Sequence, residues 1–279
     1  MIKVLEWNKI RAWAGAKVKL MVWIEDEKAQ VAYIDCKEGV ESICEMSIKR
    51  HKGMGVHSID EENLISDILS YSAAAGKGVG MDKIIFIDNS SFCIARCTEI
   101  PQFRFRWMQK RAAVNKCIME SNISLGNYIF KEVEIKKRSD CTDVLVLAIM
   151  QKRMDSFNQI SKGLGALKTS VYSGAHILFN EAACISSVFE HGTFLYDRGF
   201  SVMEMILEAE GTEFKELQIK DARQEIKRLK SIFGEKHKIY TNIAGFEELK
   251  EVEDSHAGTM SRKFNVDRAL IERLSGELL

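Results

Sequence analysis

Residues 193–206 read TFLYDRGFSVMEMI, and the prediction of the fold depends most on this stretch. A short apolar strand runs into Asp197, Gly199 follows two residues later, and a second apolar run continues the chain. Asp-x-Gly at the tip of a hairpin has two interpretations. It is an ordinary tight turn, or its backbone N–H groups face a nucleotide phosphate. These residues alone leave both interpretations open.

The composition is that of an ordinary globular protein. The chain has 279 residues, 46% hydrophobic and 29% charged, which is enough for a core and one or two domains. Forty basic and forty acidic residues cancel, which argues against a general binder of nucleic acid or membrane surfaces. The longest apolar run, 144–150, has the length of a strand and not of a membrane span. Charges in MIKVLEWNKIR argue against a signal peptide.

Cysteines and histidines show no ligand pattern. The seven cysteines are scattered, and Cys93 and Cys97 would lie about 13 Å apart on a strand. We predict reduced, mostly buried thiols in a cytoplasmic protein. The six histidines lack the spacing of a zinc site.

The first half of the chain predicts strands, a helix and a further strand pair. Segments rich in Val, Ile, Trp and Tyr predict strands at 3–7, 18–26, 30–36 and 41–48. Ser58 and Glu61 have the spacing of a capping box, and the helix after them would bury Leu64, Ile65, Ile68 and Leu69. Two further segments, 82–88 and 92–100, are predicted to pair as strands.

The glycine-rich stretch AAAGKGVG at 73–80 is predicted to end that helix rather than to bind phosphate. A P-loop follows a strand and carries Ser or Thr after its Lys. Here a helix precedes the stretch and Gly78 follows Lys77.

A helix is predicted at 103–121, with Trp107, Arg111, Val114 and Ile118 at helical spacing. Its exposed face would be basic, through Arg104, Arg106, Lys110, Arg111 and Lys116. This face is either solvated or a docking surface for an acidic partner.

The second half repeats the order of strands and helices. An alternating strand is predicted at 128–137 and a central, doubly covered strand at 143–150. A helix follows, with Met154, Phe157, Ile160 and Leu164 facing inward. Further elements are predicted at 173–188 (helix), 193–196, 201–211 and 213–219 (strands), 221–233 (helix) and 237–245 (strand). This repetition predicts two α/β lobes of related topology.

The order and its landmarks resemble the actin-like proteins of type IV pilus assembly (PilM type) and type II secretion (GspL type). DKIIFIDNSSFCIARCTEIP at 82–101 looks like the family's strand pair, and the stretch 143–167 is similar to its next strand and helix. TFLYDRGFSVMEMI looks like the second phosphate loop, and KIYTNIAGFEEL at 238–249 resembles the turn that contacts adenosine. The resemblance covers most of residues 1–255.

The resemblance implies an α/β fold: a two-lobed, actin-like (ribonuclease H-like) fold with mixed sheets flanked by helices. Residues 1–140 would form the first lobe, with an inserted strand–helix subdomain, and residues 141–255 the second. The chain between Gly199 and Ala244 is too short for a full outer subdomain, so the second lobe is expected to be reduced. Residues 256–279 would form an amphipathic tail helix.

The resemblance also implies a nucleotide site. The second phosphate loop would be at Asp197 and Gly199, and the first in LEWNKIRAW at 5–13, where Glu6 and Asn8 stand at the family's Asp and Gly. Gly245 would belong to the adenosine turn. Asn8 fills space that a glycine leaves for a phosphate, and Arg198 would either face a phosphate or fill its place.

The implied function is that of a cytoplasmic scaffold at the inner face of the cytoplasmic membrane. Its partners would be the cytoplasmic tail of an inner-membrane pilus or secretion protein and the assembly ATPase, with Arg104, Arg106 and Lys110 as candidate contacts. No catalytic residue, metal or certain cofactor is predicted. The alternative is an ATPase or small-molecule kinase in which Glu6 and Asp197 hold Mg-ATP; Mg-ATP binding without turnover is intermediate. The chain could also be the cytoplasmic fragment of a longer membrane protein.

Overall fold

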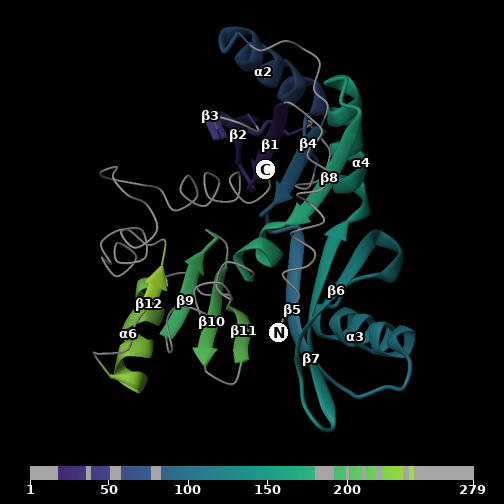
Figure 1. Ribbon diagram of the computed structural model, residues 1–279, viewed down its shortest axis with the longest axis vertical. Helices are drawn as coiled ribbons and strands as arrows, with labels where there is room; N and C mark the ends of the chain where they lie inside the picture. The colour runs from purple at the N-terminus through teal and green to yellow at the C-terminus, as the bar shows by residue number, and fades with distance from the viewer. Residues whose placement is uncertain are drawn as a thin grey trace.

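The structure is a computed structural model that describes residues 18–35, 39–50, 58–76, 83–179, 192–198, 201–208, 211–217, 222–234 and 239–241. Three β-sheets organise this part of the chain (Figure 1). None of its helices is long and apolar enough to cross a membrane.

The first lobe is built on a five-stranded mixed sheet in the order β3-β2-β1-β4-β8. Its strands are β1 (Val18–Ile24), β2 (Lys28–Asp35), β3 (Gly39–Ser47), β4 (Lys83–Asp88) and β8 (Lys168–Ser173). β1 is antiparallel to β2 and parallel to β4, and β4 is parallel to β8. Helices α2 (Glu61–Ala74) and α4 (Gln151–Gly163) pack against one face of the sheet. Successive side chains of a strand point to opposite faces of the sheet. Val22 and Phe86 therefore lie under the helices, while Trp23 and Ile87 lie on the other face.

An inserted subdomain follows β4. It contains β5 (Cys93–Pro101), α3 (Arg106–Ser121), a short 3-10 turn (Leu125–Asn127), β6 (Tyr128–Lys137) and β7 (Cys141–Met150), with strand order β5-β7-β6. β7 is the central strand, as its continuous apolar run predicts. α3 covers one face of this sheet through Ala113, Val114 and Cys117.

The second lobe repeats the pattern of the first. It contains β9 (Gly192–Asp197), β10 (Val202–Glu208), β11 (Gly211–Leu217), α6 (Ala222–Phe233) and β12 (Ile239–Thr241), in the order β11-β10-β9-β12. β9 is antiparallel to β10 and parallel to β12. These are the relations that β1 has to β2 and β4, so the prediction of two lobes of related topology is confirmed.

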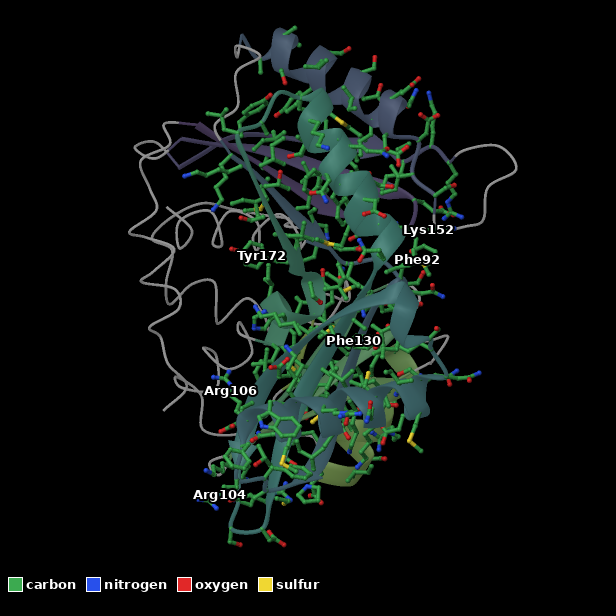
Figure 2. All side chains as sticks on the ribbon, turned by 90° about the vertical axis from the view of Figure 1, so that its right-hand side faces the viewer. Phe92, Arg104, Arg106, Phe130, Lys152 and Tyr172 are labelled. Atoms are coloured by element: carbon green, nitrogen blue, oxygen red, sulfur yellow. The ribbon has the colours of Figure 1, made fainter. Side chains whose placement is uncertain are left out.

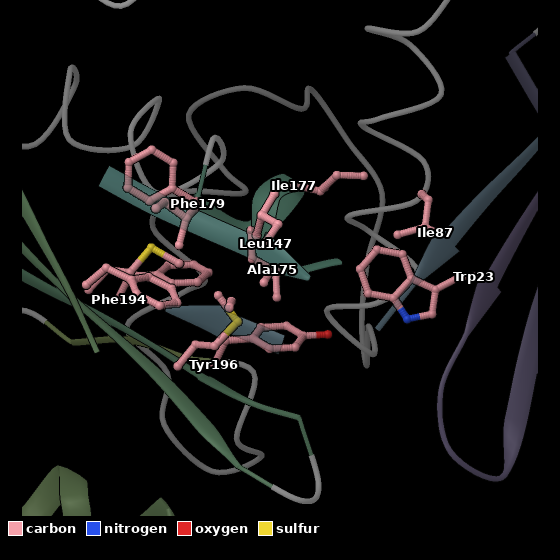
Figure 3. Close-up of a cluster of buried hydrophobic side chains, with 14 of the residues drawn as sticks. Trp23, Ile87, Leu147, Ala175, Ile177, Phe179, Phe194 and Tyr196 are labelled. Carbon is pink, nitrogen blue, oxygen red and sulfur yellow. The ribbon is translucent and has the colours of Figure 1, made fainter. Parts of the chain in front are cut away.

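One apolar cluster joins all three sheets (Figure 3). Trp23 and Ile87 come from the first lobe, Leu147 from the insertion, and Phe194 and Tyr196 from the second lobe. β11 also packs against β5 and β6. The lobes therefore share a core where they meet.

Several local predictions need correction. β4 and β5 do not pair; β4 lies in the first sheet and β5 pairs with β7. The N-cap of α2 is Asp60, whose side chain accepts from the N–H of Asn63, and not Ser58. β8 was not predicted. On α3, the helical spacing of Trp107 with Val114 and Ile118 predicts an inward ring, but Trp107 is exposed. On α6, the spacing of Phe233 with Ile226 and Leu229 predicts the same, and Phe233 is exposed as well.

The strand pairing also bears on the domain boundary that we placed after residue 140. β6 and β7 form one hairpin around that position, and β8 joins the first lobe through β4. On sheet membership we propose that the first lobe with its insertion extends through residue 173. The strand expected at 3–7 and the tail helix expected at 256–279 lie outside the described residues.

Candidate functional site

Three turns come together where the lobes meet. They follow β1 (residues 25–27), β4 (residues 89–92) and β9, of whose turn the structure describes residues 198 and 201. The β1–β2 turn and the β9–β10 turn occupy the same place in their two lobes, because each joins an antiparallel pair of strands. The resemblance indicates the β9–β10 turn as the second phosphate-binding loop. The N–H of Asn89 donates to the carbonyl of Ile24 at 2.7 Å and so joins the first two turns.

The side chain of Arg198 links the third turn to the second. Its Nε donates to Oδ1 of Asn89 at 3.1 Å. Its Nη2 donates to the carbonyls of Ser90 and Cys93 at 3.1 and 3.4 Å. Its Nη1 donates to Oε1 of Glu216 at 2.6 Å. The guanidinium is fully buried and bridges the two lobes.

The second lobe holds this arginine from behind. Oε1 of Glu216 also accepts from the hydroxyl of Ser201 at 2.7 Å. The N–H of Arg198 donates to the carbonyl of Ser201 at 2.9 Å and closes the turn. The hydrogen bonds to the carboxylate of Glu216 are charge-assisted, and such bonds are stronger than those between neutral groups.

The side chain of Asn89 has room at its position because Gly174, which packs against it, has no side chain. A Cβ added at Gly174 would lie 2.5 Å from Oδ1 of Asn89. Any larger residue at position 174 would push away the oxygen that accepts from Arg198.

The carboxylate of Asp26, in the turn after β1, also accepts hydrogen bonds. Oδ1 of Asp26 accepts from the N–H and the hydroxyl of Ser91 at 3.0 and 2.9 Å. Glu25 beside it accepts from Nε1 of Trp23 at 3.3 Å and pairs with Lys28 at 3.5 Å.

A second buried ion pair supports the β4–β5 turn from the first lobe. Arg153 of α4 donates to both oxygens of Asp88 at 2.9 and 3.1 Å. Its guanidinium lies over the rings of Phe92 and Phe157, 5.3 and 5.5 Å from their centroids. Ser90 donates to Asp88 through its hydroxyl at 2.6 Å. Figure 2 shows Phe92 beside α4.

Cys93 lies next to Arg198 but is not a nucleophile. Burial and the charge of Asp88 raise the pKa of its thiol to about 12, although Arg198 works in the other direction. The thiol donates to the hydroxyl of Ser173 at 3.1 Å. It therefore stays protonated and inert at neutral pH.

The described residues of these turns do not fit Mg-ATP. A phosphate between the two hairpins needs open space and free backbone N–H groups, and its metal needs acids that are free to hold it. Here the guanidinium of Arg198 lies between the turns after β4 and β9, Asp26 bonds Ser91, and Asp88 pairs with Arg153. In the part of the chain that the structure describes, no group of three His, Cys, Asp or Glu residues is placed to hold a metal ion.

The predicted nucleotide residues are only partly within this region. Asp197 ends β9 and is half-buried. Glu6, Asn8, Gly199 and Gly245 lie outside the described residues.

Sequence reasoning did not select the other members of the site: Asp26, Asn89, Arg153 and Glu216. One signal is present in the sequence, because a polar run, DNSS at 88–91, begins at the last residue of the apolar strand β4.

The predicted partner contacts Arg104, Arg106 and Lys110 are exposed around the start of α3. Lys110 pairs with Glu132 of β6 at 3.0 Å. A small concavity between α3 and the insertion sheet is lined by Arg106, Gln109, Lys110, Glu132, Glu134 and Val144.

Comparison with known proteins identifies the fold. No protein-family model and no curated protein sequence matches the chain. Among solved structures, the PilM–PilN type IV pilus biogenesis complex is similar, with TM-score 0.56 and 11% identity over 85% of this chain and 69% of that one. A Bacteroides thetaiotaomicron protein described by its actin-like ATPase fold is similar over 97% of this chain and 99% of that one, with TM-score 0.58 and 12% identity.

The cytoplasmic domain of EpsL, an inner-membrane component of the Vibrio cholerae type II secretion system, aligns with TM-score 0.43 and 14% identity over 71% of each chain. The first two structures carry the conclusion. The chain has an actin-like ATPase fold with mixed sheets flanked by helices, as the sequence predicts.

Proposed function

We propose that the chain is an actin-like scaffold of a type IV pilus or type II secretion assembly at the cytoplasmic face of the inner membrane. It would bind the cytoplasmic segment of a membrane protein there. The observation that carries the proposal is the guanidinium of Arg198, which is buried between the turns after β4 and β9 and bonds Asn89, Ser90 and Glu216. A fold that buries its own cation beside the turn expected to hold phosphate is suited to presenting surfaces rather than to phosphoryl transfer.

Similarity to the PilM–PilN complex supports the choice of assembly. The name of that complex joins two proteins, PilM and PilN, in type IV pilus biogenesis. We therefore propose a pseudo-ATPase, with the assembly ATPase as a further partner.

The nucleotide alternatives receive less support. An ATPase or small-molecule kinase has to place metal-bound phosphates between the two hairpins. Any bound ATP would compete with Arg198 for that space and would leave Glu216 buried without its cation, which is costly. Mg-ATP binding without turnover meets the same obstacle.

We propose that the partner's segment docks in the concavity between α3 and the insertion sheet. Arg106 and Lys110 line it with Glu132 and Glu134, and we place Arg104 at its rim. Because the walls carry both signs of charge, a segment with alternating charges fits better than a purely acidic one.

Photocrosslinking in the source organism tests this proposal. A benzoylphenylalanine residue at Gln109 would report on the concavity, and one at Lys162, exposed on α4, is the matched control. We expect the Gln109 probe to form a crosslink with an inner-membrane protein that has a short cytoplasmic segment, and the Lys162 probe to form none.

The proposal is wrong if the Gln109 probe captures no membrane protein above the Lys162 control. It is also wrong if the purified chain hydrolyses ATP and loses this activity in Asp197→Ala.

A further inference from the structure

Exposed aromatic and basic residues gather at the start of α3. We call Arg104, Phe105, Arg106, Trp107, Met108 and Arg111 the α3 entry patch. Phe105 is 51% exposed, Trp107 63% and Met108 36%. The helix packs on its sheet with other residues, Ala113, Val114 and Cys117. The exposed rings are therefore not required for the fold of the subdomain.

The patch is strongly cationic. Residues 102–119 contain no Asp or Glu. Lys110 and Lys116 pair with Glu132 and Glu120, whereas Arg104, Arg106 and Arg111 form no ion pair with any carboxylate in the described part of the chain. The guanidinium of Arg104 instead lies 5.6 Å from the centroid of the Phe105 ring.

The patch lies at the edge of the molecule. Figure 2 shows Arg104 near the lower end of the molecule, with its side chain directed outward. A broad surface can therefore reach these side chains without entering a cleft.

We propose that the α3 entry patch docks on the anionic phospholipid surface of a membrane. Trp side chains prefer the headgroup region of a bilayer, and Arg side chains are attracted to anionic lipids. Aromatic anchors combined with a basic face are typical of segments that lie in the membrane interface.

An acidic polypeptide is the competing occupant, and the surroundings disfavour it. The concavity that Arg106 shares with the patch contains Glu134 and also Glu132, which pairs with Lys110. The two carboxylates disfavour a purely acidic chain. A lipid surface needs only the side chains that point outward, and these are the arginines and rings of the patch.

The zero net charge of the chain predicts no general attraction to membranes, but it describes the whole molecule. Within about a Debye length, roughly 8–10 Å, a surface responds to local charge, and the patch concentrates three arginines that form no ion pair among the described residues. Arg104 and Arg106 are also the residues proposed to contact the partner's segment, but lipid binding itself needs no pilus or secretion partner.

Vesicle sedimentation of the purified full chain tests the inference at low ionic strength. The two probes are vesicles of phosphatidylcholine alone and of an equimolar mixture with phosphatidylglycerol. We expect sedimentation with the mixed vesicles only, and weaker binding as salt is added.

Two variants locate the contact. Replacing the three arginines (R104Q, R106Q, R111Q) should weaken binding about 100-fold, and replacing the rings (F105A, W107A) should weaken it at least about tenfold. The matched controls are K152Q, K162Q and K227Q together, which remove the same charge from exposed sites elsewhere, and L167A, which removes a side chain that is 79% exposed.

Three results would overturn the inference. The first is that the chain does not sediment with mixed vesicles at low salt. The second is that the control lysine variant loses as much binding as the arginine variant. Binding of polyglutamate that needs the three arginines, without vesicle binding, would assign the patch to an acidic polypeptide instead.

Discussion

The guanidinium of Arg198 donates to acceptors from both lobes: Asn89, Ser90 and Cys93 on one side and Glu216 on the other. An arginine cannot lose its charge inside a protein. Its burial is therefore stable only while these acceptors stay in place. This requirement makes Arg198 a buried link between the two lobes, from the turn after β4 to β11.

Arg198→Met should lower the free energy of unfolding by about 3–5 kcal/mol, because it leaves the carboxylate of Glu216 buried without its cation. Urea unfolding measures the loss. Arg111→Met is the matched control, since Arg111 is exposed, and should stay within about 0.5 kcal/mol of wild type.

A double variant separates the ion pair from packing. Arg198→Met combined with Glu216→Leu should cost less than the sum of the two single changes, because neither charge is then left alone. Additive losses would show that the two side chains are not coupled.

The role of Arg198 lies beyond what a sequence can predict. Its partner Asn89 is 109 residues away in the chain, and only the meeting of the lobes brings the two together. Asp26 lies in a turn whose sequence, Glu25 to Glu27, carries no pattern that marks a site. The resemblance indicates residues 5–13 for the first phosphate loop, and these lie outside the described residues.

At the scale of single elements, the start of α2 shows how local chemistry sets a boundary. Both Ser58 and Asp60 precede the helix, and each has a side chain that can cap it. The side chain of Asp60 accepts from the N–H of Asn63 at 3.0 Å.

Asp60→Ala should therefore destabilise the protein by about 1 kcal/mol, the usual effect of losing an N-cap. Ser58→Ala should cost less. Urea unfolding of the two variants compares them directly, and a larger loss at Ser58 would restore the capping box predicted from the sequence.

The packing of α6 on the second sheet includes a buried acid. Burial raises the pKa of Glu204, and its hydrogen bond with Glu225 raises it further, while Arg228 and Lys215 lower it. Arg228 donates to Glu204 at 3.2 Å and pairs with Glu225 as well.

A raised pKa in the folded state means that protonated Glu204 stabilises the fold. This contribution is complete below the ordinary value of 4.5 and is lost as the pH rises through the folded pKa. Wild type should thus lose stability relative to Glu204→Gln between acidic and neutral pH. Urea unfolding of both proteins across this range measures the difference, and a constant difference would contradict the assigned shift.

Elements with a strong apolar pattern could be predicted from the sequence, and polar ones could not. β7 and the inward face of α4 follow from their apolar residues. β8 reads KTSVYS, and its first residues are exposed, so the sequence gives no alternation that indicates a strand. It becomes a strand because it pairs in parallel with the edge of β4.

At the scale of the whole molecule, the apolar cluster that joins the three sheets makes the lobes depend on each other. Leu147 lies in this cluster with Trp23 and Tyr196, all three buried (Figure 3). Losing part of it should weaken all three sheets together.

Leu147→Ala should cost about 2–5 kcal/mol, because it opens a cavity where the sheets meet. The unfolding transitions of wild type and variant should each coincide when followed by tryptophan fluorescence and by far-UV circular dichroism. Separate transitions would show that the lobes unfold independently.

We propose that the chain keeps an actin-like fold in which Arg198 takes the place of a phosphate. Calorimetric titration of wild type and Asp197→Ala with Mg-ATP tests it most directly. We predict no heat of binding for either protein up to millimolar ATP. Micromolar binding by wild type that is lost in Asp197→Ala would contradict the claim and make the turn after β9 a working phosphate loop.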